Sequence, residues 1–321
     1  MINRLLNIVY VKILLFIIAT SCLFSCSDSN VVDVQENDLP DGVTGFTNIN
    51  YEFLSIAPYH TQTSMLTGYQ NKLYRIGSRV PVQVLDLATF SWSFIPLPDS
   101  SFWRWDGAAV TIKDSIYIIG TYAESTDILK LSPTTNSFQH TNVELPSYFH
   151  YPAYCTFNDK IIFFSLRTEN VYEYNPENNK LSIKSSNPFY NVSDVNLTLS
   201  SGKYQNYFYI FGGYHDLPEN RFYRMNLENY QWEKLYYPSI LERKNANGSV
   251  FNNSLILIAD TATTYEYSFQ KNEWYIDTTR VPIYTRFSNG YLDRGEMSFF
   301  EDDSCLYVTD IVSNKVWRIT K

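Results

Sequence analysis

The sequence has few of the residues on which several protein classes depend. Its 321 residues include 12 glycines, 4 cysteines and 4 histidines. Twelve glycines are too few for a collagen-like chain, and the four histidines fall in no metal-binding spacing. Basic residues number 25 against 33 acidic ones, so the chain lacks the positive charge of a nucleic-acid-binding protein. We therefore expect no nucleic-acid partner, no metal and no cofactor.

Aromatic residues, by contrast, are abundant. The chain has 27 tyrosines, 21 phenylalanines and 6 tryptophans, and 45% of its residues are hydrophobic. This composition excludes an intrinsically disordered chain. Tyrosine, phenylalanine and tryptophan are enriched in half-buried strands. The composition therefore predicts a folded protein rich in β-strands.

The N-terminal residues predict export. Basic Arg4 and Lys12 precede an apolar run from Ile13 to Phe24. A helix needs about 20 apolar residues to span a bilayer, and this run is shorter. Such a run after a basic start is typical of a secretory signal. The sequence Leu23-Phe24-Ser25-Cys26 resembles the lipobox of bacterial lipoproteins, which implies cleavage after residue 25 and lipid on Cys26. An ordinary secretory signal and an uncleaved helix are the alternatives.

These observations divide the chain into three parts: a signal peptide over 1–25, an acidic flexible tether over 26–48, and a folded domain over 49–321. The resemblance implies an outer-membrane lipoprotein, exposed at the cell surface and held to the membrane by its lipid alone. We expect it to be a monomer. Cys155 and Cys305 lie in apolar runs and are expected to be buried and unpaired.

A short β-branched or aromatic run recurs six times along the folded domain, with onsets 43 to 51 residues apart. Each run follows a pair of turn-forming residues by two to four positions, a spacing that predicts a β-hairpin. The six runs begin at Leu73, Ile116, Ile161, Phe208, Leu255 and Leu306, and the turn pairs are Gln70-Asn71, Lys113-Asp114, Asn158-Asp159, Gln205-Asn206, Asn252-Asn253 and Asp302-Asp303.

A second regularity follows downstream of five of these runs. A polar turn is followed, six residues after its first residue, by a large apolar residue that we expect to anchor a further strand in the core. The pairs are Asp86 and Trp92, Ser132 and Phe138, Asn175 and Leu181, Asn226 and Trp232, and Ser268 and Trp274. Each unit is therefore predicted to be a four-stranded meander, and repeated units of this size are typical of a β-propeller.

The repeats resemble the kelch repeat, in which an apolar strand ends in two glycines and a later tryptophan follows a turn. Phe211-Gly212-Gly213 is the one full match to the diglycine. The resemblance implies an all-β, six-bladed propeller like the central domain of galactose oxidase. The last repeat lacks a fourth strand, and the segment Phe53 to Pro58 resembles one. We predict that this N-terminal strand closes the last blade. A pair of β-sandwiches is the alternative architecture.

Candidate binding residues lie in the loops around the expected channel mouth. Basic and aromatic side chains there would bind an anionic or polyhydroxylated ligand through charge-assisted hydrogen bonds and stacking, although bases at these positions could instead only anchor neighbouring blades. The candidates are His60, Arg104, Trp105, His150, Arg243, Arg286 (or Arg294 at the same place) and His215.

The sequence favours a binding module over an enzyme. It contains no nucleotide-binding or nucleophile motif. We expect the ligand to be a glycan or a partner protein in a surface complex. The alternative is a sugar epimerase similar to the kelch-type sialic acid mutarotases, in which Arg104, His150, Arg243 and Glu296 would be the groups to examine.

Overall fold

The structure, a computed structural model, describes most of the chain from residue 39 onward. All of these residues belong to a compact unit that spans 35–321. The predicted signal peptide and Cys26 lie outside the described residues. The described residues are 39–61, 64–98, 107–120, 127–145, 149, 152–190, 199–212, 221–241, 246–259, 263–277, 281, 283, 287–288, 291–292, 297–302, 304–310 and 313–321.

The unit is built from strands that pair mainly antiparallel, and all six predicted runs form strands. Four sheets have four strands each. Their strands are β3 (Ser64–Tyr69), β4 (Lys72–Gly77), β5 (Val82–Asp86) and β6 (Trp92–Ile95); β7 (Ala108–Ile112), β8 (Ser115–Ile119), β9 (Asp127–Ser132) and β10 (Ser137–Glu144); β11 (Ala153–Phe157), β12 (Lys160–Phe164), β13 (Asn170–Asn175) and β14 (Lys180–Ser186); and β2 (Asn50–Ile56), β27 (Lys315–Thr320), β26 (Leu306–Asp310) and β25 (Met297–Glu301).

The prediction of six separate sheets differs from this structure, because the remaining strands share one nine-stranded sheet. It consists of two four-stranded meanders and the added strand β1, and a single parallel bridge between Ser201 and Ser249 joins the meanders. The strands are β15 (Leu199–Tyr204), β16 (Tyr207–Gly212), β17 (Arg221–Asn226), β18 (Trp232–Lys234), β19 (Ala246–Phe251), β20 (Ser254–Ala259), β21 (Thr264–Ser268), β22 (Glu273–Asp277) and β1 (Val43–Phe46). A two-stranded sheet, β23 (Phe287–Ser288) and β24 (Tyr291–Leu292), and a 3-10 turn at Ser239–Leu241 complete the elements.

The turns explain why the two sequence regularities recur. Asn158 and Asp159 have φ of 51° and 57°, the left-handed conformation that a two-residue hairpin needs at both positions. In the turn before each anchor residue, the fifth residue, counted from the first residue of the turn, also has a left-handed backbone conformation. These residues are Phe90, Asn136, Asn179, Tyr230 and Asn272, with φ between 52° and 58°. This shared conformation reverses the chain within a constant number of residues, which produces the constant anchor spacing.

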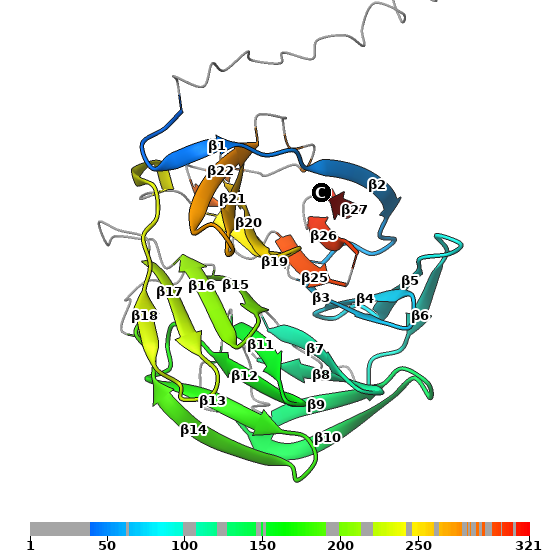
Figure 1. Cartoon of the computed structure of the whole chain (residues 1–321). Coiled ribbons are helices and arrows are strands. Elements are labelled where there is room, and N and C mark those ends of the chain that lie inside the picture. Colours follow the sequence, from blue (N-terminus) through cyan, green and yellow to red (C-terminus); the bar gives the residue numbers. More distant parts are fainter. Residues whose placement is uncertain are drawn as a thin grey trace, which may run out of the picture. The chain divides into compact units, whose positions relative to one another are not determined.

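The N-terminal segment forms two outer strands in succession. β1 pairs in parallel with β22, and β2 pairs antiparallel with β27, its Asn50 lying opposite Thr320 (Figure 1). The sequence predicts a flexible tether over 26–48, but residues 43–46 form a strand that is paired with β22, so this part of the prediction is wrong. β22 is an outer strand of its meander, and its free edge offers backbone partners to β1.

The sheets stand around a central axis as a β-propeller (Figure 1). Their innermost strands, β3, β7, β11, β15, β19 and β25, adjoin one another in that order and return to β3. Hydrophobic side chains fill the spaces between neighbouring sheets. The anchor Trp274 is 1% exposed and packs between β16, β17 and its own meander, and Trp92 and Trp232 pack against two other cores while remaining half-buried. The expectation that the repeated tryptophans serve core packing is confirmed.

The described residues include no helix long and apolar enough to cross a bilayer.

Candidate functional site

Most of the predicted binding residues fall outside the described part of the chain. These are Arg104, Trp105, His150, Arg243, Arg286 and His215, together with Arg294 and Glu296. The one described candidate, His60, is exposed and does not line the central cavity. It follows β2 in a segment whose backbone is held at the junction of two sheets.

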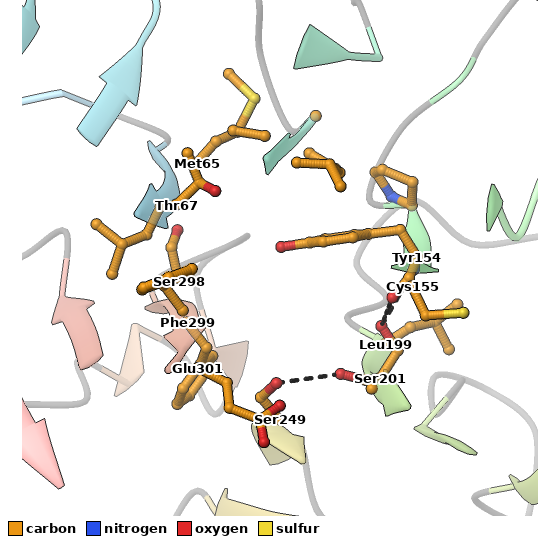
Figure 2. A pocket seen from close by; sticks show the side chains of 18 of the residues that line it. Met65, Thr67, Tyr154, Cys155, Leu199, Ser201, Ser249, Ser298, Phe299 and Glu301 are labelled. Atoms are coloured by element: carbon orange, nitrogen blue, oxygen red, sulfur yellow. Dashed lines mark hydrogen bonds between the residues drawn. The ribbon is translucent and has the colours of Figure 1, made fainter. Parts of the chain in front are cut away.

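The inner strands enclose a cavity of about 400 Å³ on the axis of the propeller. Side chains from β3, β7, β11, β15, β19 and β25 all contribute to its wall, so it runs along the inner strands (Figure 2). Its volume lies within the range of small-molecule sites, about 300–1,000 Å³. The wall consists mainly of small residues, because six strands that converge on one axis leave little room for larger side chains.

Hydroxyl groups join the inner strands at four of their junctions. Ser64 and Ser298 share a hydrogen bond of 3.1 Å between their Oγ atoms, and the Thr111 hydroxyl donates to the Gly68 carbonyl at 2.8 Å. The Ser249 hydroxyl donates to the Ser201 carbonyl at 3.3 Å, and the Tyr154 amide donates to Ser201 Oγ at 3.2 Å. These bonds fix the wall of the cavity and occupy part of its hydrogen-bonding capacity.

The close packing of the inner strands leaves no space for a side chain at Gly68, which is on β3. A Cβ atom on Gly68 would stand 2.2 Å from the ring of Phe300 on β25. Gly68 therefore lets β3 and β25 approach closely.

Two polar side chains in the wall keep unused hydrogen-bonding groups. Asn247, on β19, is 6% exposed, and its Nδ2 has no hydrogen-bond partner. Tyr154 extends from β11 into the cavity (Figure 2), and its hydroxyl bonds to no described residue. An unsatisfied buried donor costs about 1–3 kcal/mol. A ligand that accepts a hydrogen bond from Asn247 would remove this cost.

Burial keeps the side chains of Tyr154 and the adjacent Cys155 protonated. It raises the pKa of Tyr154 to about 12, so the phenol retains its proton at neutral pH. Burial also raises the pKa of the Cys155 thiol, although nearby Lys203 opposes this shift. A thiol held neutral is a poor nucleophile. The expectation that Cys155 and Cys305 are buried and unpaired is confirmed.

Charge is sparse along the described wall. Lys203 and Glu301 are its charged residues, and they stand near the C-terminal ends of β15 and β25. No three His, Cys, Asp or Glu side chains gather as metal ligands would within the residues that the structure describes. The described wall therefore provides hydroxyl, amide and apolar surfaces rather than a cluster of charges.

A buried polar cluster holds the segment after β2 in place. Gln83 is fully buried; its Oε1 accepts from the Tyr59 amide at 2.8 Å and its Nε2 donates to the Tyr59 carbonyl at 3.2 Å. The fully buried Arg75 donates to the same carbonyl at 2.8 Å and to Asn314 Oδ1 at 2.9 Å. These bonds orient residues 57–61 between two sheets, which explains why His60 lies at this junction and away from the cavity.

A second cluster brings both ends of the described chain to one buried carboxylate. Glu266, on β21, has a side chain that is 3% exposed. It accepts hydrogen bonds from Ser254 at 2.6 Å and Thr47 at 2.5 Å, and it pairs with the ammonium of Lys321. Burial by itself would raise the pKa of Glu266, but these three partners together lower it below 4.5. The carboxylate is therefore ionised at neutral pH.

Sequence reasoning did not identify the cavity residues as a site. Ser64, Thr67, Ser201 and Ser249 stand in the first strand of their units, where they are indistinguishable from ordinary strand residues. A usable signal exists in Asn247, because an asparagine at the second position of the buried strand sequence ANGSVF is unusual.

Comparisons with known proteins agree with the fold. No protein-family model and no curated protein matches the chain. Among solved structures, "Structure of YjhT" is 12% identical, covers 84% of this chain and 95% of its own, and has a TM-score of 0.62. A Bacteroides thetaiotaomicron structural genomics protein of unknown function is 9% identical over 85% of this chain and 76% of its own, with a TM-score of 0.60.

An auxiliary nutrient binding protein from Bacteroides thetaiotaomicron is also similar. It is 12% identical, covers 87% of this chain and 75% of its own, and has a TM-score of 0.54. At these identities the likeness concerns the fold alone. The arrangement of sheets and these neighbours together make the chain a β-propeller.

Proposed function

We propose that this propeller is a binding module for a glycan, which it takes into the central cavity. The observation that supports this proposal is a cavity of about 400 Å³ with hydroxyl and amide groups in its wall, among them the buried Asn247 Nδ2, which has no hydrogen-bond partner among the described residues. Such a wall can exchange hydrogen bonds with a polyhydroxylated ligand. The basic residues Arg104 and Arg243 would contact the ligand at the mouth.

The neighbouring structures support a binding role without identifying the ligand. One similar protein is described as binding nutrients, and the propeller architecture generally places binding sites on or near its axis. Among the described residues, no three His, Cys, Asp or Glu side chains gather as metal ligands would, and the Cys155 thiol is buried and held neutral. Binding without chemical conversion is therefore the function that these residues support best.

An oligosaccharide array with the purified full-length protein tests the proposal. We expect binding to at least one class of glycan and loss of that binding in Ser249→Trp, whose indole would fill the cavity. The matched control is Ile183→Trp, at an outer-strand position that is 62% exposed. An array with no bound glycan, acidic or neutral, would overturn the proposal in favour of a protein ligand.

We further infer that the ring has six blades closed by β2. The nine-stranded sheet divides at its single parallel bridge into two meanders, each with the strand order of a blade. With the four separate sheets this gives six units, the number of inner strands that adjoin around the axis. β2 pairs with β27 at the outer side of the last unit. The kelch-like repeat regularities agree with this count.

The chain is also proposed to be an exported lipoprotein, held at the outer surface through Cys26. The support is the lipobox-like sequence before Cys26 and the signal-like residues 1–25. We expect Cys26→Ser to abolish incorporation of radiolabelled palmitate and to release the protein from membranes. Cys22→Ser is the control, because it alters the neighbouring cysteine only. Unchanged labelling of the Cys26 variant would refute the anchor.

A further inference from the structure

The orphaned amide of Asn247 restricts what the cavity can hold. Its Nδ2 is a hydrogen-bond donor, the side chain is more than nine-tenths buried, and the residue lines the cavity. The hydroxyl groups at the neighbouring junctions are already bonded to backbone or to one another. A ligand beside Asn247 must therefore present an acceptor oxygen or nitrogen to it.

The described wall around Asn247 and Tyr154 carries no net charge to balance an ionic ligand. Its polar groups there are hydroxyls, amides and a neutral thiol. The two charged residues of the described wall are of opposite sign: Lys203 lies near the Cys155 thiol, and Glu301 is the last residue of β25. A charged group that leaves water without a partner costs far more than a neutral polar group. The cavity thus favours an uncharged ligand.

Apolar surfaces alternate with these polar groups. Met65, Tyr154 and Phe299 belong to the wall (Figure 2), and so does Met297. A ligand that fits must therefore carry apolar faces as well as hydroxyl or amide oxygens. Among the glycans, a neutral sugar combines these two features, whereas an acidic sugar adds a carboxylate that the wall does not balance.

We propose that the cavity binds an uncharged carbohydrate and that Asn247 and Tyr154 determine its specificity. This inference rests on the proposed function and names its ligand class. Asn247 donates to a hydroxyl or ring oxygen of the sugar. Tyr154 lies along an apolar face of the sugar and exchanges a hydrogen bond through its hydroxyl, which keeps its proton at neutral pH because burial raises the pKa of Tyr154 to about 12.

The experiment compares neutral and acidic probes by calorimetry with the full-length protein. The neutral probes are maltoheptaose, mannohexaose and xylohexaose, and the acidic ones are sialyllactose and oligogalacturonate. Asn247→Leu removes the amide at similar volume, and Tyr154→Phe removes only a hydroxyl. We expect a neutral probe to bind and each variant to weaken it about tenfold, which corresponds to about 1.4 kcal/mol. Tyr236→Phe, at a position that is 66% exposed, is the control and should leave the affinity unchanged.

The outcomes separate the inference from the function on which it rests. Binding of acidic probes alone would overturn the inference and leave glycan binding in place. Binding of a neutral probe that neither variant weakens would also overturn it, because the sugar would then lie elsewhere. If no probe binds, both the inference of an uncharged sugar and the proposed glycan binding are refuted. Tyr154→Phe keeps the test decisive if Asn247→Leu does not fold, since it leaves the packing of the ring intact.

Discussion

The buried pair of Glu266 and Lys321 allows a quantitative test of how the chain ends stabilise the propeller. Lys321→Met removes the ammonium and leaves a carboxylate that is 3% exposed, still bonded to Ser254 and Thr47. Removal of one partner from a fully buried pair costs about 3–5 kcal/mol. Lys321 keeps 28% of its side chain exposed, so solvent screens the pair and we expect about 2 kcal/mol.

Thermal unfolding at pH 7 measures this loss. For a domain of this size, a loss of that magnitude lowers Tm by roughly 4 °C. The control is Lys234→Met, which removes an exposed lysine on β18 and should leave Tm unchanged. In a Glu266→Gln background, Lys321→Met should have little effect, because the amide needs no counter-charge.

The effect also has a defined pH dependence. Because the pKa of Glu266 is lowered in the folded protein, its contribution to stability is present above the ordinary value of 4.5 and is lost as pH falls through the folded value. The Tm of Lys321→Met should therefore approach that of the unaltered protein at low pH. A variant whose Tm stays within 1 °C of the unaltered protein at pH 7 would refute the reasoning.

Two further pairs of substitutions test local features of the fold by urea unfolding. Phe90→Asn should raise the free energy of unfolding by about 1 kcal/mol, because asparagine tolerates the left-handed conformation better than phenylalanine. A decrease in the free energy of unfolding would contradict the view that the positive φ of Phe90 strains the folded protein. Tyr230→Asn relieves the same conformation but removes a 2.6 Å hydrogen bond to buried Glu173, so we expect a net loss of about 2 kcal/mol. Gly68→Ala should cost about 1–3 kcal/mol because its methyl group would meet an aromatic ring on β25. Gly45→Ala, whose methyl group would stand 3.5 Å from its neighbour, should be nearly neutral, and equal losses in the two glycine variants would exclude the steric explanation.

The repeating part of the fold was predictable because each unit carries its own local signals. Left-handed residues such as Asn71 and Asn158 mark the hairpins, and anchors such as Trp232 stand at a fixed distance from the preceding turn. The strand β1 was missed because its sequence, VTGF, is short, contains a glycine and follows acidic residues. Its pairing with β22 depends on a free sheet edge, which no local sequence signal reveals.

The candidate site was less predictable because it, too, depends on tertiary structure and not on a local sequence signal. The loop residues that we selected, such as Arg104 and His60, were chosen for their chemical type, whereas the cavity wall is made from small strand residues brought together from all six inner strands. Ser249 and Ser298 are 49 positions apart in the sequence, and only the ring places both beside one cavity. Asn247 had a recognisable signal, but its unused donor could be identified only from its surroundings.

The pairing of β2 with β27 sets the order in which their four-stranded sheet can be completed. Asn50 and Thr320 lie opposite each other although almost the whole folded chain separates them. Bringing the ends of such a long segment together costs roughly 5 kcal/mol of chain entropy, which the other sheets reduce if they are already assembled. During synthesis β2 must therefore wait for β27, which is made more than 250 residues later. Any nascent or truncated chain that lacks its final residues carries an unpaired outer strand, a natural starting point for aggregation and a natural target for quality-control proteases.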